Sequence, residues 1–331
     1  MTDCPGCPRR SAARERWAAP RREVPLTGIL NVDKPPGITS HDVVDAIRRV
    51  SGQRRVGHAG TLDPMATGVL LVCLGQATRV AEYLMGGRKQ YRASVVLGST
   101  TDTYDAEGEV TSSGGRTDFE QAEIEAALAG LVGRIEQVPP VYSALKQGGE
   151  PLHKRVRRGE QVEVQPRPVE IDEIRLLDWQ APVLILEITC SPGTYVRSLA
   201  HDLGQRLGSG AYLGSLVRLA SGRFTLEDAT SLERLEEAFQ HGQEEQFLLP
   251  LDEALLDWPA IVVDSDEKQR LVQGQAIAAG AAAGGRVPDP TEPESERWAR
   301  VYSSDGDFLA IVAYERDAGR WRPKKVFYAS I

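Results

Sequence analysis

The sequence predicts an α+β protein with a mixed, mainly antiparallel sheet, followed by a small C-terminal β-barrel. Segments with strand and helix patterns follow one another without the strict alternation that produces a doubly wound parallel sheet. The pattern changes at Trp258-Pro259, after which short strand-like runs are separated by Gly, Asp and Pro. A length of 331 residues suits one large domain that carries a smaller one.

The first strong signals are a strand and a capped helix. Gly28–Asp33 is typical of a short buried strand, and Lys34–Gly37 ends it, because Pro cannot continue a ladder and Gly permits the turn. Thr39 with Asp42 three residues later has the form of a capping box. The apolar stripe of the helix that we expect there consists of Val43, Val44, Ile47 and Val50.

Further strands and helices follow the same rules. Strands are expected over Tyr91–Leu97 and Val183–Cys190, and helices over Phe119–Leu131 and Val196–Leu207. The stretch 227–257 is acidic and helical in pattern. In the C-terminal part, strand-like runs lie at Ala260–Val263, Ala299–Val301, Phe308–Tyr314 and Lys325–Tyr328, with a polar, proline-containing loop over 284–296.

Composition limits the classes of function. The net charge of −8 argues against nucleic-acid binding through overall positive charge, so any such binding requires local basic patches. No apolar run approaches the roughly 20 residues that cross a bilayer. Four cysteines in a chain of this size indicate no disulfide framework, which fits a reducing cytoplasm. Residues 1–25 are typical of a solvated tail, and Cys4 and Cys7 have the spacing of half a zinc site without a second pair nearby, so no metal is expected.

The most informative segment is Gly57–Leu70. Its glycines and Pro64 describe a tight loop that presents Asp63 beside apolar residues, where a carboxylate can act as nucleophile or base. A structural interpretation is also open, in which Asp63 caps a helix that starts around Pro64; the two roles are compatible. His58 fits a loop histidine pressed against a ligand. The loop lacks the features of a nucleotide-phosphate loop, so ATP or NAD use is unsupported.

Three other segments carry candidate site residues. Tyr91 opens a strand in Lys89-Gln90-Tyr91 and could be either a core residue or a ring that contacts a ligand. Arg197 lies in the first turn of a predicted helix, where its charge opposes the helix dipole and needs a partner such as Asp63. A basic run could contact phosphates or simply be solvated surface. This run contains Lys146, His153, Lys154, Arg155, Arg157 and Arg158.

Several of these segments, in this order, resemble one family. They include 28–40, 56–74, Lys89–Arg92 and Thr101–Thr103. The resemblance continues through 137–140, 142–146, 193–197 and Arg218-Leu219. Together they are similar to the bacterial TruB-type tRNA pseudouridine-55 synthases over about residues 26–225. The weakest similarity lies near the C-terminus, where Gln273–Gln275 and Pro323 resemble the family tail.

The resemblance implies a fold and a reaction. It implies a pseudouridine synthase catalytic domain over 26–257, with an RNA-gripping insertion at about 138–170 and a PUA-like RNA-binding domain over 258–331. The implied reaction isomerises the T-loop uridine of elongator tRNAs by base flipping. No cofactor, no membrane and no obligatory protein partner are expected, and we expect a cytoplasmic monomer that binds the tRNA T arm. Alternatives are a tRNA-folding chaperone without essential catalysis and a relative that depends on guide RNA.

The resemblance also implies roles for individual residues. Asp63 would be the catalytic carboxylate, Tyr91 would stack on the flipped uracil and take part in proton transfer, and Arg197 would keep Asp63 ionised and oriented. The remaining implied contacts serve substrate binding. His58 would fill the space that the flipped base leaves, Leu216 would form an apolar wall, Lys34 and Pro35 would shape the floor, and Lys146, Lys154 and Arg155 would contact phosphates.

Overall fold

The computed structural model describes residues 25–143, 145–147, 150–151, 155, 158, 160, 162, 164–278 and 298–327. The expected N-terminal tail with Cys4 and Cys7, and the expected loop over 284–296, lie outside these residues. Within the described part, no helix is both long and apolar enough to span a membrane.

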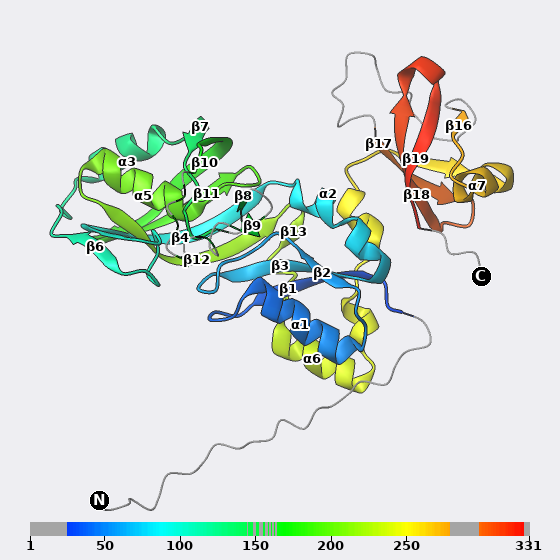
Figure 1. The fold of residues 1–331 in the computed structure, drawn as a ribbon, viewed down its shortest axis with the longest axis horizontal. Helices are drawn as coiled ribbons and strands as arrows, with labels where there is room; N and C mark the ends of the chain where they lie inside the picture. Colours follow the sequence, from blue (N-terminus) through cyan, green and yellow to red (C-terminus); the bar gives the residue numbers. More distant parts are fainter. Residues whose placement is uncertain are drawn as a thin grey trace, which may run out of the picture.

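A ten-stranded sheet forms the larger part of the molecule (Figure 1). Its main path runs β14-β1-β3-β12-β4-β11-β10-β7, with β2 beside β3 and β13 beside β12. All pairings are antiparallel except β1 with β14 and β3 with β12, which confirms the predicted mixed, mainly antiparallel sheet. The strands are β1 (Gly28–Lys34), β2 (Val56–Ala59), β3 (Thr67–Leu74), β4 (Lys89–Leu97), β7 (Gly133–Gln137), β10 (Arg167–Gln180), β11 (Val183–Cys190), β12 (Ala211–Ser221), β13 (Phe224–Thr225) and β14 (Thr230–Ser231).

Two pairs of helices pack on this sheet at different places (Figure 1). Helices α1 (Ser40–Ser51) and α6 (Leu232–His241) lie together beside β1, whereas α3 (Gln121–Ala129) and α5 (Val196–Leu207) lie together beside β4 and β12. Shorter elements are also present among the described residues. They are α2 (Ala81–Met85), β5 (Ser99–Thr101), β6 (Val110–Ser113), β8 (Lys146–Gln147), β9 (Glu150–Pro151) and the 3₁₀ turns η1 (Gly75–Arg79), η2 (Glu244–Phe247) and η3 (Leu251–Leu255).

A second sheet of five strands forms the C-terminal part, in the order β15-β17-β18-β19-β16. It curls into a half-barrel that is consistent with the predicted PUA-like barrel. Its elements are β15 (Ala260–Val263), α7 (Ser265–Val272), β16 (Ile277–Ala278), β17 (Trp298–Ser303), β18 (Phe308–Glu315), η5 (Arg316–Ala318) and β19 (Arg320–Val326). The boundary between domains at 257/258 stays a prediction.

Strand β3 lies between two apolar cores. Leu70 and Val72 face the core that contains the helices, whereas Leu71 and Cys73 face a core that also includes Ile311 of the C-terminal sheet. Successive side chains of a strand point to opposite faces, so a strand covered on both faces is apolar at nearly every position. This double burial fixes the strand that begins four residues after Asp63.

Several expectations from the sequence are met. The strand at Gly28, the strand Val183–Cys190 and the helix Val196–Leu207 are present, and Thr39 and Asp42 form the expected capping box. The helix expected from Phe119 begins later, at Gln121, because Glu120 is its N-cap and forms a capping box with Glu123. The acidic stretch 227–257 holds one α-helix and two 3₁₀ turns, and the last strand is Arg320–Val326 rather than 325–328.

The capping interpretation of Asp63 is wrong. No helix begins at Pro64; the Ala66 N–H donates to the Asp63 carbonyl at 3.1 Å in a turn, and β3 follows from Thr67. The run after Asp63 is apolar at consecutive positions, and pairing with β1, β2 and β12 makes it a central strand.

Gly68 provides a test of this packing, because it pairs with Arg218 of β12. Its φ is +94°, and a Cβ there would lie 2.3 Å from the Arg218 carbonyl oxygen. Gly37 is a matched control, since its φ is +81° and a Cβ would meet nothing within 4 Å. We expect Gly37→Ala to lower the free energy of unfolding by about 1 kcal/mol from backbone strain alone, and Gly68→Ala by about 3 kcal/mol or more.

Denaturant unfolding of both variants measures the difference. Equal losses in the two variants would contradict the close β3–β12 approach.

Candidate active site

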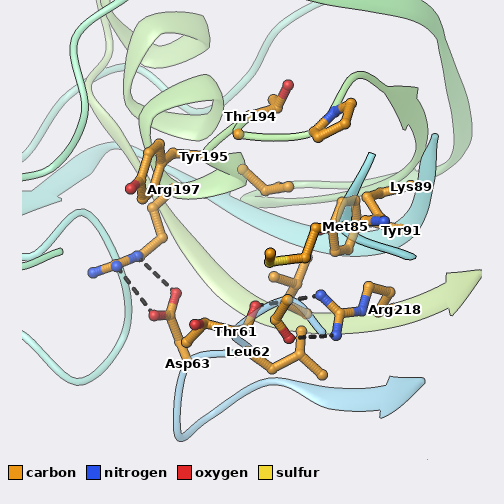
Figure 2. Close-up of a pocket in the computed structure, with 15 residues that line it drawn as sticks. Thr61, Leu62, Asp63, Met85, Lys89, Tyr91, Thr194, Tyr195, Arg197 and Arg218 are labelled. Carbon is orange, nitrogen blue, oxygen red and sulfur yellow. Dashed lines mark hydrogen bonds and ion pairs between the residues drawn. The ribbon is translucent and has the colours of Figure 1, made fainter. Parts of the chain in front are cut away.

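A cavity of about 280 Å³ opens where β4, β12, the β2–β3 loop and the start of α5 meet (Figure 2). We call it the Asp63 cavity. Its lining residues are Gly60, Thr61, Leu62, Asp63, Met85, Lys89, Tyr91, Pro192, Gly193, Thr194, Tyr195, Val196, Arg197, Leu216 and Arg218. It therefore brings together Asp63, Tyr91, Arg197 and Leu216, which are far apart in the sequence.

The loop that carries Asp63 is held on both sides of this residue. Before it, the Ser40 hydroxyl donates to the Leu62 carbonyl at 3.0 Å and accepts from the Leu62 N–H at 2.8 Å. After it, the Pro64 carbonyl accepts from Lys34 Nζ at 3.1 Å and from the Gly37 N–H at 2.8 Å. The strand, turn and helix predicted from Gly28 to Val50 thus serve as the support of this loop.

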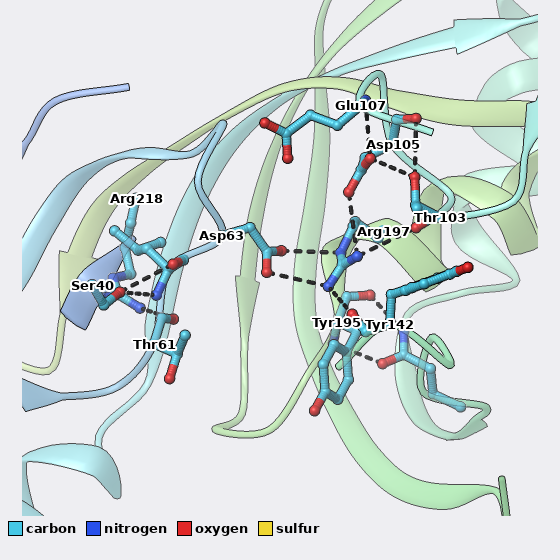
Figure 3. Close-up of polar contacts among 12 residues, drawn as sticks. Ser40, Thr61, Asp63, Thr103, Asp105, Glu107, Tyr142, Tyr195, Arg197 and Arg218 are labelled. Atoms are coloured by element: carbon cyan, nitrogen blue, oxygen red, sulfur yellow. Dashed lines mark hydrogen bonds and ion pairs between the residues drawn. The ribbon is translucent and has the colours of Figure 1, made fainter. Parts of the chain in front are cut away.

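Arg197 is the central contact of the cavity (Figure 3). Its Nε lies 3.0 Å from Asp63 Oδ2, and its Nη2 donates to Asp63 Oδ1 at 3.2 Å. The Nη2 hydrogen bond and the Nε ion-pair contact thus hold the carboxylate at both of its oxygens. Only 6% of the Arg197 side chain is exposed, against 34% of Asp63, so Arg197 lies behind the carboxylate and Asp63 faces the cavity. The partner expected for Arg197 is present.

A second carboxylate, Asp105, shares the same guanidinium. Arg197 Nη1 lies 3.2 Å from Asp105 Oδ2, and both side chains are buried. Asp105 is itself fixed, because the Thr103 hydroxyl donates to its Oδ1 at 2.6 Å and the Glu107 N–H donates to the same atom at 3.1 Å. Two Arg197 N–H groups also reach the carbonyls of Thr103 and Tyr142, at 3.3 and 3.1 Å. The guanidinium is held from several directions.

The start of α5 sets the position of Arg197 along the chain. Gln137 at the end of β7 donates to the Tyr195 carbonyl at 3.0 Å and accepts from the Tyr195 N–H at 2.8 Å. The helix begins one residue later, at Val196. The Gln137 amide thereby binds both backbone polar groups of Tyr195, the residue before the helix, and fixes the turn that carries Arg197.

The environment shifts the acidity of Asp63. Burial raises the pKa of its carboxyl above the ordinary value, and the nearby charge of Asp105 adds to the rise, while Arg197 and Lys34 counteract it. Lys34 is fully buried, and this burial lowers the pKa of its ammonium group to about 8. The loop is thus supported by a cation whose own charge is costly to bury.

Tyr91 and Leu216 form the wall opposite Asp63. Both are buried and lie on the neighbouring strands β4 and β12. Burial raises the pKa of the Tyr91 phenol, while Arg218 opposes the rise through its charge and a hydrogen bond. The phenol is therefore protonated in the free protein at neutral pH.

Other predicted site residues lie elsewhere. His58 on β2 does not line the Asp63 cavity, and burial together with the charge of Arg218 lowers the pKa of its imidazole. Lys34 and Pro35 lie behind the loop rather than in the cavity, although the Lys34 contact with Pro64 agrees with a shaping role.

The predicted basic arm is described only in part. The backbone of Lys146 forms β8, and Lys154 lies outside the described residues. Arg155 contacts Glu160 at 2.8 Å, and Arg158 contacts the same carboxylate at 2.7 Å. Part of the positive charge of this run is thus balanced within the arm itself.

No role was predicted from the sequence for Asp105, Arg218 or Ser40. Arg218 follows the alternating apolar residues of β12, a strand that was not predicted from the sequence. Its guanidinium donates hydrogen bonds to two carbonyl groups of the Asp63 loop. An arginine within an apolar strand pattern is the signal that could have identified it. Asp105 and Ser40 gave no comparable signal, since short polar residues near turns are common.

Comparison with known proteins identifies the family. A model described as the TruB family pseudouridylate synthase N-terminal domain matches residues 48–196, and one described as the tRNA pseudouridylate synthase B C-terminal domain matches 197–256. A tRNA pseudouridine synthase B of Xanthomonas axonopodis pv. citri is 42% identical, covering 92% of this chain and 94% of its own. The chain belongs to the TruB family. A second TruB-family relative, tRNA pseudouridine synthase B of Dehalococcoides mccartyi, is 43% identical over 91% of this chain and 97% of its own.

Solved structures show the same fold at lower identity. A structure of an H/ACA RNP bound to a substrate RNA containing 2′-deoxyuridine has a TM-score of 0.70 at 23% identity, covering 91% of this chain and 85% of the other. A Cbf5-Nop10-Gar1 complex has a TM-score of 0.68 at 25% identity, covering 86% and 78%. The pseudouridine synthase fold predicted from the sequence is confirmed, and as a TruB-family member the chain is a tRNA pseudouridine synthase.

The contact between Arg197 and Asp63 predicts that Arg197→Met changes the pH dependence of the reaction rate. Because the guanidinium lowers the pKa of Asp63 against burial, its removal should raise that pKa further. Asp63 would then be protonated at a higher pH, and the acid limb of the kcat/KM profile should move to higher pH. Affinity for RNA should change much less than the rate.

The profile of uridine isomerisation against pH, with a parallel RNA-binding titration, measures both effects. An unchanged acid limb, or equal losses of rate and affinity, would indicate that Arg197 has only a structural role.

Proposed function

We propose that this chain isomerises the T-loop uridine of tRNA, uridine-55, with Asp63 as its catalytic carboxylate. The observation that carries the proposal is the two-point contact of Arg197 with Asp63 at the edge of a small cavity. A carboxylate oriented in this way can attack or assist at one reacting atom. A cavity of about 280 Å³ suits one nucleoside rather than a stacked helix.

The reaction breaks the N1–C1′ bond of uridine, turns the uracil and joins it again through C5. Atoms are conserved and no electrons are gained or lost, so the proposal needs no redox partner and no phosphate donor. A base inside a duplex-like arm cannot reach Asp63, and flipping it out costs on the order of a few kcal/mol, less in a loop. The T loop is therefore a suitable substrate for this cavity.

The cavity suggests where each part of a flipped uridine lies. The sugar would lie at the Asp63 end, and the uracil would lie against the ring of Tyr91 and the apolar side chain of Leu216. His58 lies outside the cavity on β2, the strand that pairs with β3. It would contact the RNA loop that the flipped base has left. The insertion at about 138–170 and the C-terminal half-barrel would hold the rest of the T arm.

The enzyme is proposed to act in the cytoplasm as a single chain on free tRNA. Identity of 42–43% over more than nine-tenths of the chain links it to bacterial tRNA enzymes rather than to the RNP proteins that share its fold. Activity without partner proteins separates the proposal from a guide-RNA-dependent mode of action. Catalysis separates it from a tRNA-folding chaperone.

Asp63→Asn on a T-arm minihelix tests the assignment of the carboxylate. The amide is nearly the same size but cannot act as a nucleophile or base, so we expect the rate of pseudouridine formation to fall by at least about 1,000-fold. Minihelix affinity should stay close to that of the wild type. Asp45→Asn, an exposed acid on α1, is the control and should be fully active. Near-normal turnover by Asp63→Asn would contradict the proposal.

Tyr91→Phe separates the ring of Tyr91 from its hydroxyl. If the ring stacks on uracil and the hydroxyl takes part in proton transfer, Phe should preserve affinity and slow isomerisation, whereas Tyr91→Leu should reduce both. Single-turnover rates and binding titrations on the same minihelix measure the two effects. A fully active Tyr91→Phe would remove the hydroxyl from the mechanism.

A further inference from the structure

Arg218 is a buried cation at the floor of the Asp63 cavity. Its side chain is among the largest that are fully buried, with 1% exposed, yet it lines the cavity. Among the residues that the structure describes, no carboxylate lies within ion-pair distance of its guanidinium. Burying a charge without an opposite charge is costly, so such a residue calls for a functional explanation.

The hydrogen bonds of Arg218 all reach neutral groups. Its Nε donates to the Val69 carbonyl at 2.6 Å, its Nη1 to the Thr61 carbonyl at 3.3 Å and its Nη2 to the Gly60 carbonyl at 3.2 Å. These bonds tie β12 to both ends of the Asp63 loop. Carbonyl oxygens satisfy donors but do not neutralise a charge, so the positive potential of the guanidinium remains. Arg197 differs, because two carboxylates surround it.

The charge of Arg218 acts on the uracil end of the cavity. Figure 2 shows its guanidinium near Tyr91 and Met85, on the side away from Arg197. Burial and the charge of Arg218 lower the pKa of Lys89, another lining residue, to about 8. The same charge opposes the rise in the pKa of Tyr91. The cavity therefore has a negative group at the proposed sugar end and a permanent positive group at the proposed uracil end.

Both routes open to Asp63 place negative charge on the uracil. If Asp63 assists at the sugar, the C1′–N1 bond breaks and its electron pair stays on the ring, delocalised over N1, O2 and O4. If Asp63 adds to C6, the electron pair of the C5=C6 bond moves toward O4 as an enolate. In the first route, C5 uses this electron pair to bond C1′ and then loses its proton, while N1 takes up a proton. In the second route, C5 bonds C1′ as the C1′–N1 bond breaks, and N1 takes up a proton. C5 then loses its proton and the bond from C6 to Asp63 breaks, which restores the C5=C6 bond and frees the carboxylate. A fixed cation beside the ring would stabilise the charged species in either case.

We propose that Arg218 stabilises the negative charge that develops on the uracil, in addition to holding the Asp63 loop. The proposal rests on the proposed function, because it needs a flipped uridine in this cavity. Arg218 would then be a further catalytic residue for the reaction. The loop bonds keep its guanidinium in place before the substrate arrives, so no reorganisation is needed when charge develops.

Three substitutions separate charge from hydrogen bonding. Arg218→Gln can still donate hydrogen bonds to the loop carbonyls but has no charge, Arg218→Lys keeps a charge with poorer geometry, and Arg218→Met lacks both. We expect Gln to slow single-turnover isomerisation by about 100-fold, Lys by clearly less than Gln, and Met by at least as much as Gln. Arg48→Met is the matched control, since Arg48 also holds a backbone carbonyl, that of Val56, but does not line the cavity.

A substrate whose uracil anion is more stable separates charge stabilisation from a structural role. A purely structural role of Arg218 would slow the reaction of both substrates equally. A T-arm minihelix with 5-fluorouridine at the target position leaves a uracil whose negative charge is already stabilised by fluorine. Loss of the N1-linked nucleoside, measured by mass spectrometry after digestion, reports bond cleavage. If Arg218 stabilises this charge, the defect of Arg218→Gln should be several-fold smaller for 5-fluorouridine than for uridine, while Arg48→Met should show no difference.

Equal defects of Arg218→Gln on both substrates, or a Lys variant no better than Gln, would overturn the proposal and leave Arg218 as a support of the loop. If Arg218→Met fails to fold, the comparison of Gln with Lys still decides, and circular dichroism melting identifies that case. Wild-type protein that leaves the T-loop uridine unchanged would instead refute the proposed function. The two failures are therefore distinguishable.

Discussion

The site depends on one buried guanidinium that two carboxylates share. Arg197 holds Asp63 by a two-point contact and is itself held by Asp105 from the other side. An unpaired charge at this depth would be costly, so the three groups stabilise one another. Because Arg197 lies behind Asp63, the carboxylate keeps one face toward the cavity. The pair therefore combines charge neutralisation with a carboxylate that remains accessible from the cavity.

The rest of the fold keeps this contact in place. Strand β3 is buried on both faces, and its first residues follow the Asp63 loop directly. Lys34, Ser40 and Arg218 bind backbone groups of that loop from three different elements. Such fixed side chains allow a loop to hold a reacting group with the rigidity of a strand. In the proposed mode of action, Asp63 lies at the sugar end of the cavity and the positive charge of Arg218 lies at the uracil end.

Sequence alone predicted much of this arrangement. The strand and capped helix before the loop, the helix that carries Arg197 and its need for a carboxylate partner all follow from local patterns. The strand after Asp63 could not be told from a helix, because burial on both faces removes the period of two. Asp105 was missed because its role comes from a long-range contact across 92 residues, which no local pattern encodes. Family resemblance supplied the chemistry that these patterns lack.

The most direct test of the account is the mapping of pseudouridine in a bare tRNA transcript treated with the pure, full-length chain. Mass spectrometry after partial digestion locates each converted uridine. We predict one converted uridine, in the T loop, without any added cofactor, guide RNA or partner protein. Conversion at another position, or no conversion by the correctly folded chain, would contradict it.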